Sequence, residues 1–249
     1  MKEKAFFSQY PMVAVALSGG VDSAYLLYEA KRHAEKVQAY FVKTDFQPQL
    51  EWEDAKRIAD FLGVELTTVS VDILADEQIA ANGADRCYAC KKRLFFALAE
   101  QARADGFSVL LDGTNASDSA EDRPGMKALQ ELSVLSPLRL WGLTKTEIRS
   151  RAKEAGLFIW NKPAYACLAT RILSGQRIEK RLLERTERAE NLLFSLGFTD
   201  FRVRTIGEKA KIELREEQFP LLFESRNRIT EALLQEYAGI CLDLEGRHE

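Results

Sequence analysis

Hydrophobic and polar positions in the first two-thirds of the chain alternate between two periods. Short apolar runs of the length of buried strands are separated by stretches in which apolar residues recur at helical spacing. The apolar runs predict strands at 12–17, 37–42, 65–71, 107–113 and 133–140. The stretches between them predict helices at 22–35, 51–63, 88–105 and 145–155. Strands that alternate with helices in this way indicate a parallel sheet with helices on both faces.

A loop rich in small and polar residues at 160–177 separates this part of the chain from a different pattern. The pattern beyond the loop predicts one long charged helix, three strands and a helical stretch before the last strand. The helix is expected at 178–196 and the strands at 201–206, 209–214 and 239–244. Because the first two strands alternate apolar and polar residues, they predict an antiparallel hairpin. We therefore expect an α/β domain at 1–173 and a small α+β domain at 175–249.

The composition is that of an ordinary globular protein, with 46% hydrophobic and 29% charged residues among 249. No apolar run approaches the roughly 18 residues that a membrane helix needs. The start of the chain has no small-residue cleavage site, so no signal peptide and a cytoplasmic location are predicted. The net charge of −3 argues against a nucleic-acid partner. With only His33 and His248, a histidine-rich zinc site and histidine-assisted nucleophilic catalysis are disfavoured.

The candidate chemistry begins with the sequence SGGVDS at 18–23, directly after the first predicted strand and at the start of a helix. Its glycines allow a tight turn and close approach of the backbone to a ligand. Consecutive N–H groups at a helix N-terminus favour a phosphate, and the hydroxyls of Ser18 and Ser23 add donors. Asp22 is a candidate ligand for Mg²⁺. The alternative is a strand–helix turn that only needs glycine; the motif is not a Walker A sequence.

SGGVDS resembles the PP-loop of ATP pyrophosphatases, which cleave ATP between its α- and β-phosphates and transfer AMP to a substrate oxygen. A second landmark of that family matches Asp112-Gly113-Thr114-Asn115, at the carboxyl edge of the predicted sheet, where open α/β sheets bind ligands. The resemblance implies that one group of residues holds pyrophosphate, namely Ser18, Gly19, Gly20, Asp22 and Ser23. It also implies that a second group lines the nucleotide site, namely Asp112, Gly113 and Thr114.

Four stretches resemble the LarE family, the ATP-dependent sulfur transferases of nickel-pincer nucleotide synthesis. They are DGTNASDSAEDRPGMKAL (112–129), LSPLRLWGLTKTEIR (135–149), NKPAYACLATRI (161–172) and FRVRTIGEKAKIEL (201–214). The resemblance implies that ATP and Mg²⁺ adenylylate a carboxylate of pyridinium-3,5-biscarboxylic acid mononucleotide. Sulfur then displaces AMP and a thiocarboxylate results. It also implies a homo-oligomer, a hexamer in this family.

The same resemblance suggests roles for residues outside the loop. Arg202 and Arg204, which alternate along one strand and share a face, are expected to hold the phosphate of the nucleotide substrate. Arg123 is expected to anchor a loop over the ATP site. The metal-binding glutamate of the family falls near Glu190, although a solvent-exposed helix face is the simpler interpretation of the charged segment 178–190.

Four cysteines are candidates for handling sulfur. Cys167 lies in the motif ACLATR, where Arg171 is expected to favour the thiolate. Cys87 and Cys90 form a CxxC at the start of a predicted helix. Together with Cys167 they offer three thiolates for a [4Fe–4S] cluster, with one iron left open. Cys241, in an apolar strand pattern, is expected to be a buried small hydrophobic residue.

Two sulfur sources remain open at this point. One form of the family binds an extra sulfide on such a cluster, whereas in the other the single cysteine, here Cys167, gives up its own sulfur and becomes dehydroalanine. A zinc site or a redox pair are further interpretations of the CxxC. Lys91, directly after it, is either a ligand of the ATP phosphates or a solvated lysine.

Other functions are compatible with the same motifs. The chain is alternatively a tRNA thiolase or an ammonia-dependent synthetase of the PP-loop type. A further alternative is a non-catalytic nucleotide-binding or iron–sulfur carrier protein. Trp141 and Trp160 are expected to pack rather than to contact a cofactor.

Overall fold

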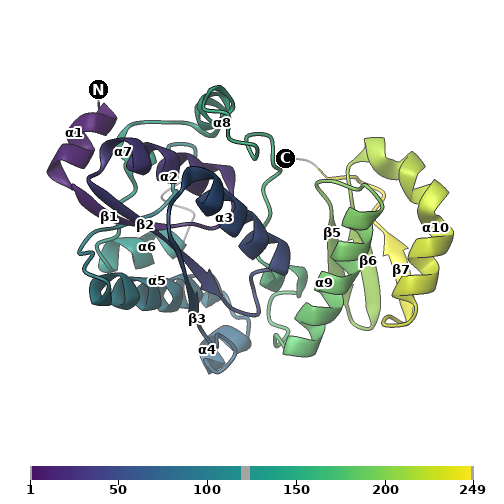
Figure 1. Ribbon diagram of the computed structural model, residues 1–249. Coiled ribbons are helices and arrows are strands. Elements are labelled where there is room, and N and C mark those ends of the chain that lie inside the picture. Colours follow the sequence, from purple (N-terminus) through teal and green to yellow (C-terminus); the bar gives the residue numbers. More distant parts are fainter. Residues whose placement is uncertain (1, 119–123, 248–249) are drawn as a thin grey trace. The chain divides into compact units, whose positions relative to one another are not determined.

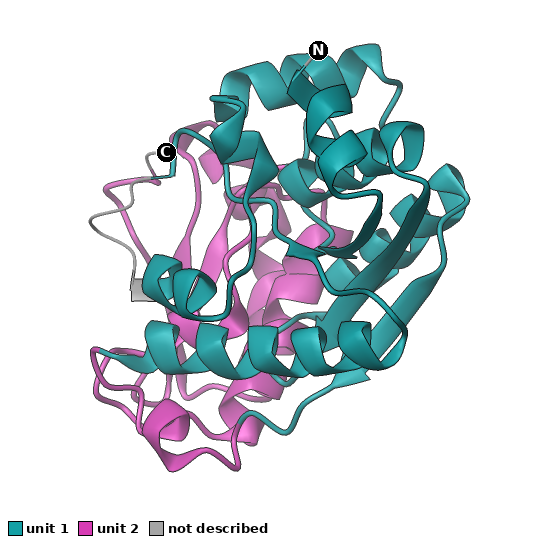
Figure 2. Cartoon of the chain, turned by 90° about the vertical axis from the view of Figure 1, so that its left-hand side faces the viewer, with its two compact units in different colours: residues 1–73, 85–162 teal, residues 74–84, 163–249 magenta. Residues whose placement is uncertain are grey.

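The computed structural model describes residues 2–118 and 124–247, and its helices and strands follow one another as Figure 1 shows. The chain folds into two compact units, which Figure 2 colours separately. Unit 1 comprises residues 1–73 and 85–162, and unit 2 comprises residues 74–84 and 163–249. Within the described residues, no helix combines the length and the apolar character that crossing a membrane requires.

The described part of unit 1 contains a parallel sheet with strand order β3-β2-β1-β4. Its strands are β1 (Met12–Ala16), β2 (Lys36–Lys43), β3 (Leu66–Ser70) and β4 (Leu110–Leu111). Its helices are α1 (Lys2–Gln9), α2 (Val21–His33), α3 (Gln49–Leu62), α5 (Arg86–Ala104), α6 (Pro124–Glu131), α7 (Pro137–Leu140) and α8 (Lys145–Glu154). The α/β class predicted from the periodicity is confirmed.

Helices cover both faces of this sheet, because successive residues of β1 point into two different hydrophobic clusters. Val13 and Val15 pack with buried residues of α2, α3 and α8. Ala14, between them, packs on the other face with Leu98 and Ala102 of α5. The central strand is therefore apolar throughout, which is why its sequence reads as a continuous run.

The strand predicted at 133–140 is wrong. Only Leu135 joins the sheet, through a single parallel bridge to Leu111. Two residues later Pro137 begins α7, because proline suits the first turn of a helix but cannot donate to a strand ladder. The strand predicted at 107–113 is correspondingly reduced to the two residues of β4.

The described part of unit 2 contains a three-stranded sheet in the order β5-β6-β7. Its strands are β5 (Arg202–Ile206), β6 (Lys209–Glu213) and β7 (Gly239–Leu242). Its helical segments are α4 (Glu77–Ala80), α9 (Lys180–Ser195), α10 (Phe219–Leu233) and the 3₁₀ segments η1 (Leu168–Arg171) and η2 (Glu216–Gln218). The antiparallel pairing of β5 and β6 confirms the predicted hairpin, while β7 runs parallel to β6.

Residues 74–84 join unit 2 although they lie between two segments of unit 1 in the sequence. The buried Asn82 donates its side-chain amide to the carbonyls of Leu173 at 2.8 Å and Gln176 at 3.0 Å. The N–H of Gly175 donates in return to the carbonyl of Asn82 at 2.9 Å. These partners lie about ninety residues away, so no local pattern announces the connection.

Two glycines fix the loop between β1 and α2. Gly19 has φ +77°, and a Cβ there would lie 2.4 Å from the carbonyl oxygen of Glu51 in α3. A Cβ on Gly113, just after β4, would lie 2.8 Å from the backbone nitrogen of Ser23. Only glycine fits either position without a shift of the backbone. The close approaches therefore bring the start of α2, the start of α3 and the end of β4 together.

Candidate functional site

The SGGVDS loop folds around the side chain of Ser23. The Ser23 Oγ accepts the N–H of Ser18 at 3.1 Å, lies 3.1 Å from the Ser18 Oγ, and donates to the carbonyl of Gly20 at 3.2 Å. Gly20 occupies the N-cap of α2 and has no side chain with which to cap it. The first turn of α2 therefore presents backbone N–H groups and the positive end of its dipole to an anion.

The second expected group lies directly beside this loop. Asp112 is buried and accepts hydrogen bonds from the hydroxyls of Thr114 and Ser136. The Nζ of Lys91 lies 4.0 Å from Asp112 Oδ2. A Cβ added at Gly125 would lie 2.7 Å from Lys91 Cδ, so the stem of this lysine crosses α6 closely. Lys91 is thus held at the carboxyl edge of the sheet, which favours the phosphate-binding interpretation over a freely solvated lysine.

Asp22 differs from the other loop residues in its electrostatics. Its Oδ2 forms an ion pair with Lys145, while its Oδ1 is buried and has no hydrogen-bond partner among the described residues. Burial raises the pKa of Asp22 above its usual value and the negative charge of Asp118 adds to the rise, whereas Lys145 and Arg149 oppose it. A buried carboxylate oxygen without a donor is suited to a cation, and Mg²⁺ prefers oxygen ligands.

Lys145 and Lys162 were not singled out from the sequence. Lys162 donates to the carbonyl of Gly19 at 2.9 Å and pairs with Asp54 at 2.7 Å, while Arg149 holds the carbonyl of Lys162 at 2.8 Å. Both lysines lie in stretches that resemble the LarE family, so the resemblance could have pointed to them. Their contact with the phosphate loop depends on the fold and has no pattern in the sequence.

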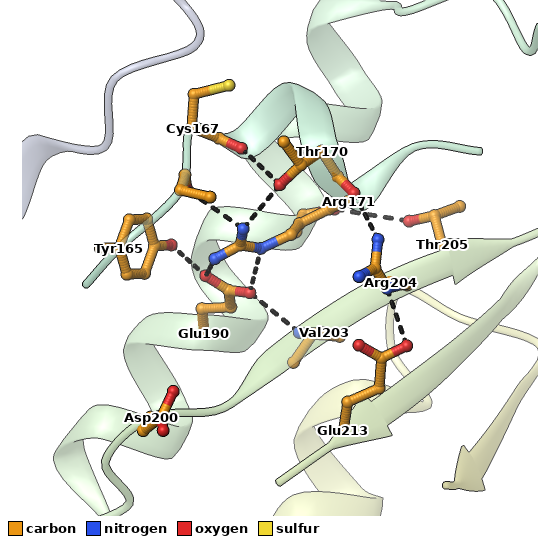
Figure 3. Close-up of polar contacts among 12 residues, drawn as sticks. Tyr165, Cys167, Thr170, Arg171, Glu190, Asp200, Val203, Arg204, Thr205 and Glu213 are labelled. Atoms are coloured by element: carbon orange, nitrogen blue, oxygen red, sulfur yellow. Dashed lines mark hydrogen bonds and ion pairs between the residues drawn. The ribbon is translucent and has the colours of Figure 1, made fainter. Parts of the chain in front are cut away.

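In unit 2, one buried carboxylate organises the segment that carries Cys167 (Figure 3). Glu190 of α9 is fully buried and accepts the Nε of Arg171 at 2.8 Å and its Nη2 at 3.2 Å. It also accepts the hydroxyl of Tyr165 and the backbone N–H of Val203, the latter at 2.8 Å. The solvent-exposed face expected for Glu190 is therefore wrong. Its donors already saturate it, so this structure gives it no free oxygen for a metal.

The backbone at Cys167 is held by the same network. Thr170 donates its N–H and its hydroxyl to the carbonyl of Cys167, at 3.0 and 2.9 Å. The Nη1 of Arg171 binds the carbonyl of Ala166 at 3.0 Å and the Thr170 hydroxyl at 2.8 Å. The Cys167 side chain is half-buried. The thiol therefore sits on a turn in which the carbonyls of Ala166, Cys167 and Thr170 accept hydrogen bonds from fixed donors.

The two arginines of β5 play different parts. Arg204 donates its Nη1 to the carbonyl of Thr170 at 2.6 Å and its Nε to Glu213 at 2.7 Å, so it links β5 to the cysteine turn. Arg202 is half-buried and forms no ion pair with the described residues. Burial and the neighbouring cations Arg247, Arg171 and Arg204 lower its pKa. Arg202 is thus the cation of this strand that is available to an anion.

Comparison with known proteins agrees with this arrangement. Residues 8–132 match the family model described as asparagine synthase. The chain is 36% identical over 219 residues to an uncharacterized protein of Synechocystis sp., covering 86% of this chain and 81% of that protein.

It is also 34% identical over 239 residues to the pyridinium-3,5-bisthiocarboxylic acid mononucleotide synthase of Lactiplantibacillus plantarum, covering 94% of this chain and 86% of that enzyme. The chain belongs to the LarE family. It is an ATP-dependent sulfur-transferring enzyme with the PP-loop fold. The tRNA-specific 2-thiouridylase MnmA of Thermotoga petrophila is 30% identical over 192 residues, or 60% of this chain and 54% of that protein.

The cysteines of this LarE-family protein are divided between the units. Cys87 and Cys90 lie one turn apart at the start of α5 in unit 1, and the Nη2 of Arg86 donates to Cys87 Sγ at 3.2 Å. Cys167 belongs to unit 2. Residues 2–118 and 124–247 contain no group of three or more His, Cys, Asp or Glu side chains arranged to hold a metal ion. None of the four cysteines forms a disulfide, and thiolates such as those of Cys87 and Cys90, which share a helix face, are the ligands that iron–sulfur clusters use.

Other expectations have mixed outcomes. Cys241 is exposed rather than buried, because Ile240 and Leu242 pack on the core and a side chain between them on a strand points the opposite way. Trp141 is buried against the rings of α1, as expected for a packing residue. Arg123 and His248 lie outside the described residues.

Replacing Arg171 with Met is expected to lower the free energy of unfolding by about 3–5 kcal/mol, because Glu190 would remain buried and charged. Glu190→Leu in the same chain should restore part of this loss. Arg181→Met breaks the exposed pair with Glu179 and should leave the free energy of unfolding nearly unchanged, because solvent screens such a pair. Urea denaturation measures all three, and equal losses for the two single variants would contradict the assigned role.

Proposed function

We propose that this enzyme activates a carboxylate of pyridinium-3,5-biscarboxylic acid mononucleotide with ATP and converts it to a thiocarboxylate. The relative from Lactiplantibacillus plantarum, named for the bisthiocarboxylic acid mononucleotide, supports this substrate. The observation that carries the proposal is the chain of hydrogen bonds from Cys167 through Thr170 to Arg204. It joins the candidate sulfur-handling thiol to the strand that bears Arg202, the cation available for the substrate phosphate.

Activation is the task of unit 1. A carboxylate oxygen of the substrate attacks the α-phosphorus, and the bond to the β-phosphate breaks with its electron pair leaving on pyrophosphate. The N-terminus of α2, the Ser18 and Ser23 hydroxyls and Lys91 stabilise the charge that develops there. Asp22 would hold Mg²⁺, whose role is to neutralise phosphate charge. Asp112, Gly113 and Thr114 line the nucleotide, while Gly19 and Gly20 let the backbone approach pyrophosphate.

Sulfur transfer is assigned to the three cysteines, and the proposal carries two versions. In the first, thiolates of Cys87, Cys90 and Cys167 would hold a [4Fe–4S] cluster, which would supply a labile sulfide. In the second, the Cys167 thiolate attacks the acyl carbon and AMP departs with the electrons of the C–O bond. Loss of the Cα proton and cleavage of the Cβ–S bond then leave dehydroalanine and free the thiocarboxylate.

We propose residues 1–173 as the PP-loop domain and 175–249 as the domain that binds substrate and supports oligomerisation. A homo-oligomer (a hexamer by resemblance), the absence of a nucleic-acid partner and a cytoplasmic location stay predictions of the sequence.

Pyrophosphate release tests the activation step. With Mg-ATP and the mononucleotide, the enzyme should form pyrophosphate, AMP and thiocarboxylate. Cys167→Ala should still release pyrophosphate but form no thiocarboxylate, because only the sulfur-transfer step is lost. Cys241→Ala is the matched control and should behave as wild type. No pyrophosphate under any condition would indicate a non-catalytic protein. Release that requires tRNA would indicate a tRNA thiolase, and ammonia-dependent product from Cys167→Ala would indicate a synthetase.

Iron and acid-labile sulfide distinguish the two sulfur sources. After anaerobic purification we expect about four of each per chain, lost in Cys87→Ala and kept in Cys241→Ala. Their absence from wild type even after reconstitution would contradict the cluster. In that case a single turnover should lower the protein mass by one hydrogen sulfide, at Cys167.

A further inference from the structure

Lys162 joins the SGGVDS loop to two helices of unit 1. Its Nζ donates to the carbonyl of Gly19 at 2.9 Å and pairs with Asp54 Oδ2 of α3 at 2.7 Å. Arg149 of α8 fixes the backbone next to it, because its Nη2 donates to the carbonyl of Lys162 at 2.8 Å and its Nη1 to that of Trp160 at 3.1 Å. The lysine is therefore held both at its backbone and at its ammonium group.

The ammonium group of Lys162 has given up most of its contact with water, since the side chain is only 19% exposed. Desolvating a charge is costly unless the charge is paired and its hydrogen bonds are made. The nearly buried Asp54 supplies the opposite charge, and the Gly19 carbonyl supplies a further acceptor. Asp54 is itself held by Arg57, at 3.2 Å. The contact between Lys162 and Gly19 is thus part of the packed structure and differs from that of a mobile surface lysine.

The carbonyl of Gly19 belongs to the same peptide unit as the N–H of Gly20. This unit is trans, and in a planar trans unit the C=O and the N–H point in opposite directions. Fixing the carbonyl on Lys162 therefore directs the Gly20 N–H away from the lysine. Gly20 is the N-cap of α2, a position at which backbone N–H groups bind anions.

A peptide unit between two glycines needs such a restraint. Glycine restricts backbone rotation least of all residues, so this unit can turn over at low cost. Turned over, it would present a carbonyl oxygen to an anion in place of an N–H. Ser23 braces the loop on either side, through the N–H of Ser18 and the carbonyl of Gly20. Neither of these groups belongs to the peptide unit between Gly19 and Gly20, which Lys162 holds.

We propose that Lys162 is a positioning residue of the phosphate loop, which holds the Gly19 carbonyl so that the Gly20 N–H faces pyrophosphate. Asp54 keeps Lys162 in place for this task. The inference rests on the proposed function, in which the SGGVDS loop binds pyrophosphate. The segment that carries Cys167 leaves unit 1 directly after Lys162, so the same contacts also fix the start of that segment.

The sign of one charge change separates this role from simple electrostatic attraction, with calorimetric titration of Mg-pyrophosphate as the measurement. Lys162→Met should weaken binding about 10- to 100-fold, the range for one hydrogen bond to a charged group. Asp54→Ala removes a negative charge, so attraction alone predicts tighter binding. Loss of the restraint on Lys162 should instead weaken it.

Lys31→Met is the matched control. Lys31 donates to the carbonyl of Gly63, just after α3, at 3.1 Å, but it does not contact the loop, so the variant should bind pyrophosphate as wild type does. Lys162→Arg keeps a charged donor and should recover part of the affinity. In the pyrophosphate-release assay the KM for ATP should rise in Lys162→Met and Asp54→Ala, and thermal unfolding midpoints check that all variants fold.

Tighter or unchanged binding of pyrophosphate by Asp54→Ala would overturn the inference, as would unchanged binding by Lys162→Met. A different result marks failure of the proposed function. If the wild type neither binds Mg-pyrophosphate nor releases it from ATP, the assignment of the SGGVDS loop fails, and the inference fails with it.

Discussion

The cysteine-bearing turn depends on one buried ion pair, between Arg171 and Glu190. Burying two charges costs several kcal/mol in desolvation, and the pair recovers this only because further groups complete the hydrogen bonding. Here Tyr165 and the N–H of Val203 complete Glu190, while Ala166 and Thr170 complete Arg171. The carboxylate also satisfies a backbone donor of β5, an edge strand. We interpret the pair as a device that fixes geometry, because it determines how the backbone presents Cys167.

A different constraint organises unit 1. The close approaches at Gly19 and Gly113 leave no room for a side chain at either position. They bring the start of α3 and the end of β4 close to the N-terminus of α2. An uncapped helix start, hydroxyls and lysines then converge where pyrophosphate charge would develop. In the proposed function the two units divide the chemistry: the start of α2 in unit 1 binds phosphate, and the turn in unit 2 positions the Cys167 thiol.

The sequence predicts the features that depend on local pattern. The parallel sheet, the loop before α2 and the β5–β6 hairpin follow from periodicity and glycine placement. The strand predicted at 133–140 does not form, because Pro137 begins a helix within the apolar run. Glu190 could not be recognised as buried, since several glutamates share its helix and its partner Arg171 lies nineteen residues away. Cys241 lies among apolar residues, which predicted burial. Side chains alternate between the two faces of a strand, however, and that of Cys241 points outward. Lys145 and Lys162 have no recognisable pattern in the sequence, because only folding brings them to the SGGVDS loop.

The central claim is that a substrate carboxylate oxygen attacks the α-phosphate of ATP. It is tested most directly with the mononucleotide labelled with ¹⁸O in both carboxylates, incubated with Mg-ATP, the enzyme and its sulfur source. Mass spectrometry of the nucleotide product reports which bond was formed. The account predicts that each AMP released carries one ¹⁸O atom, left behind when sulfur replaces the carboxylate oxygen. Unlabelled AMP, or ADP in its place, accompanying the thiocarboxylate would contradict it.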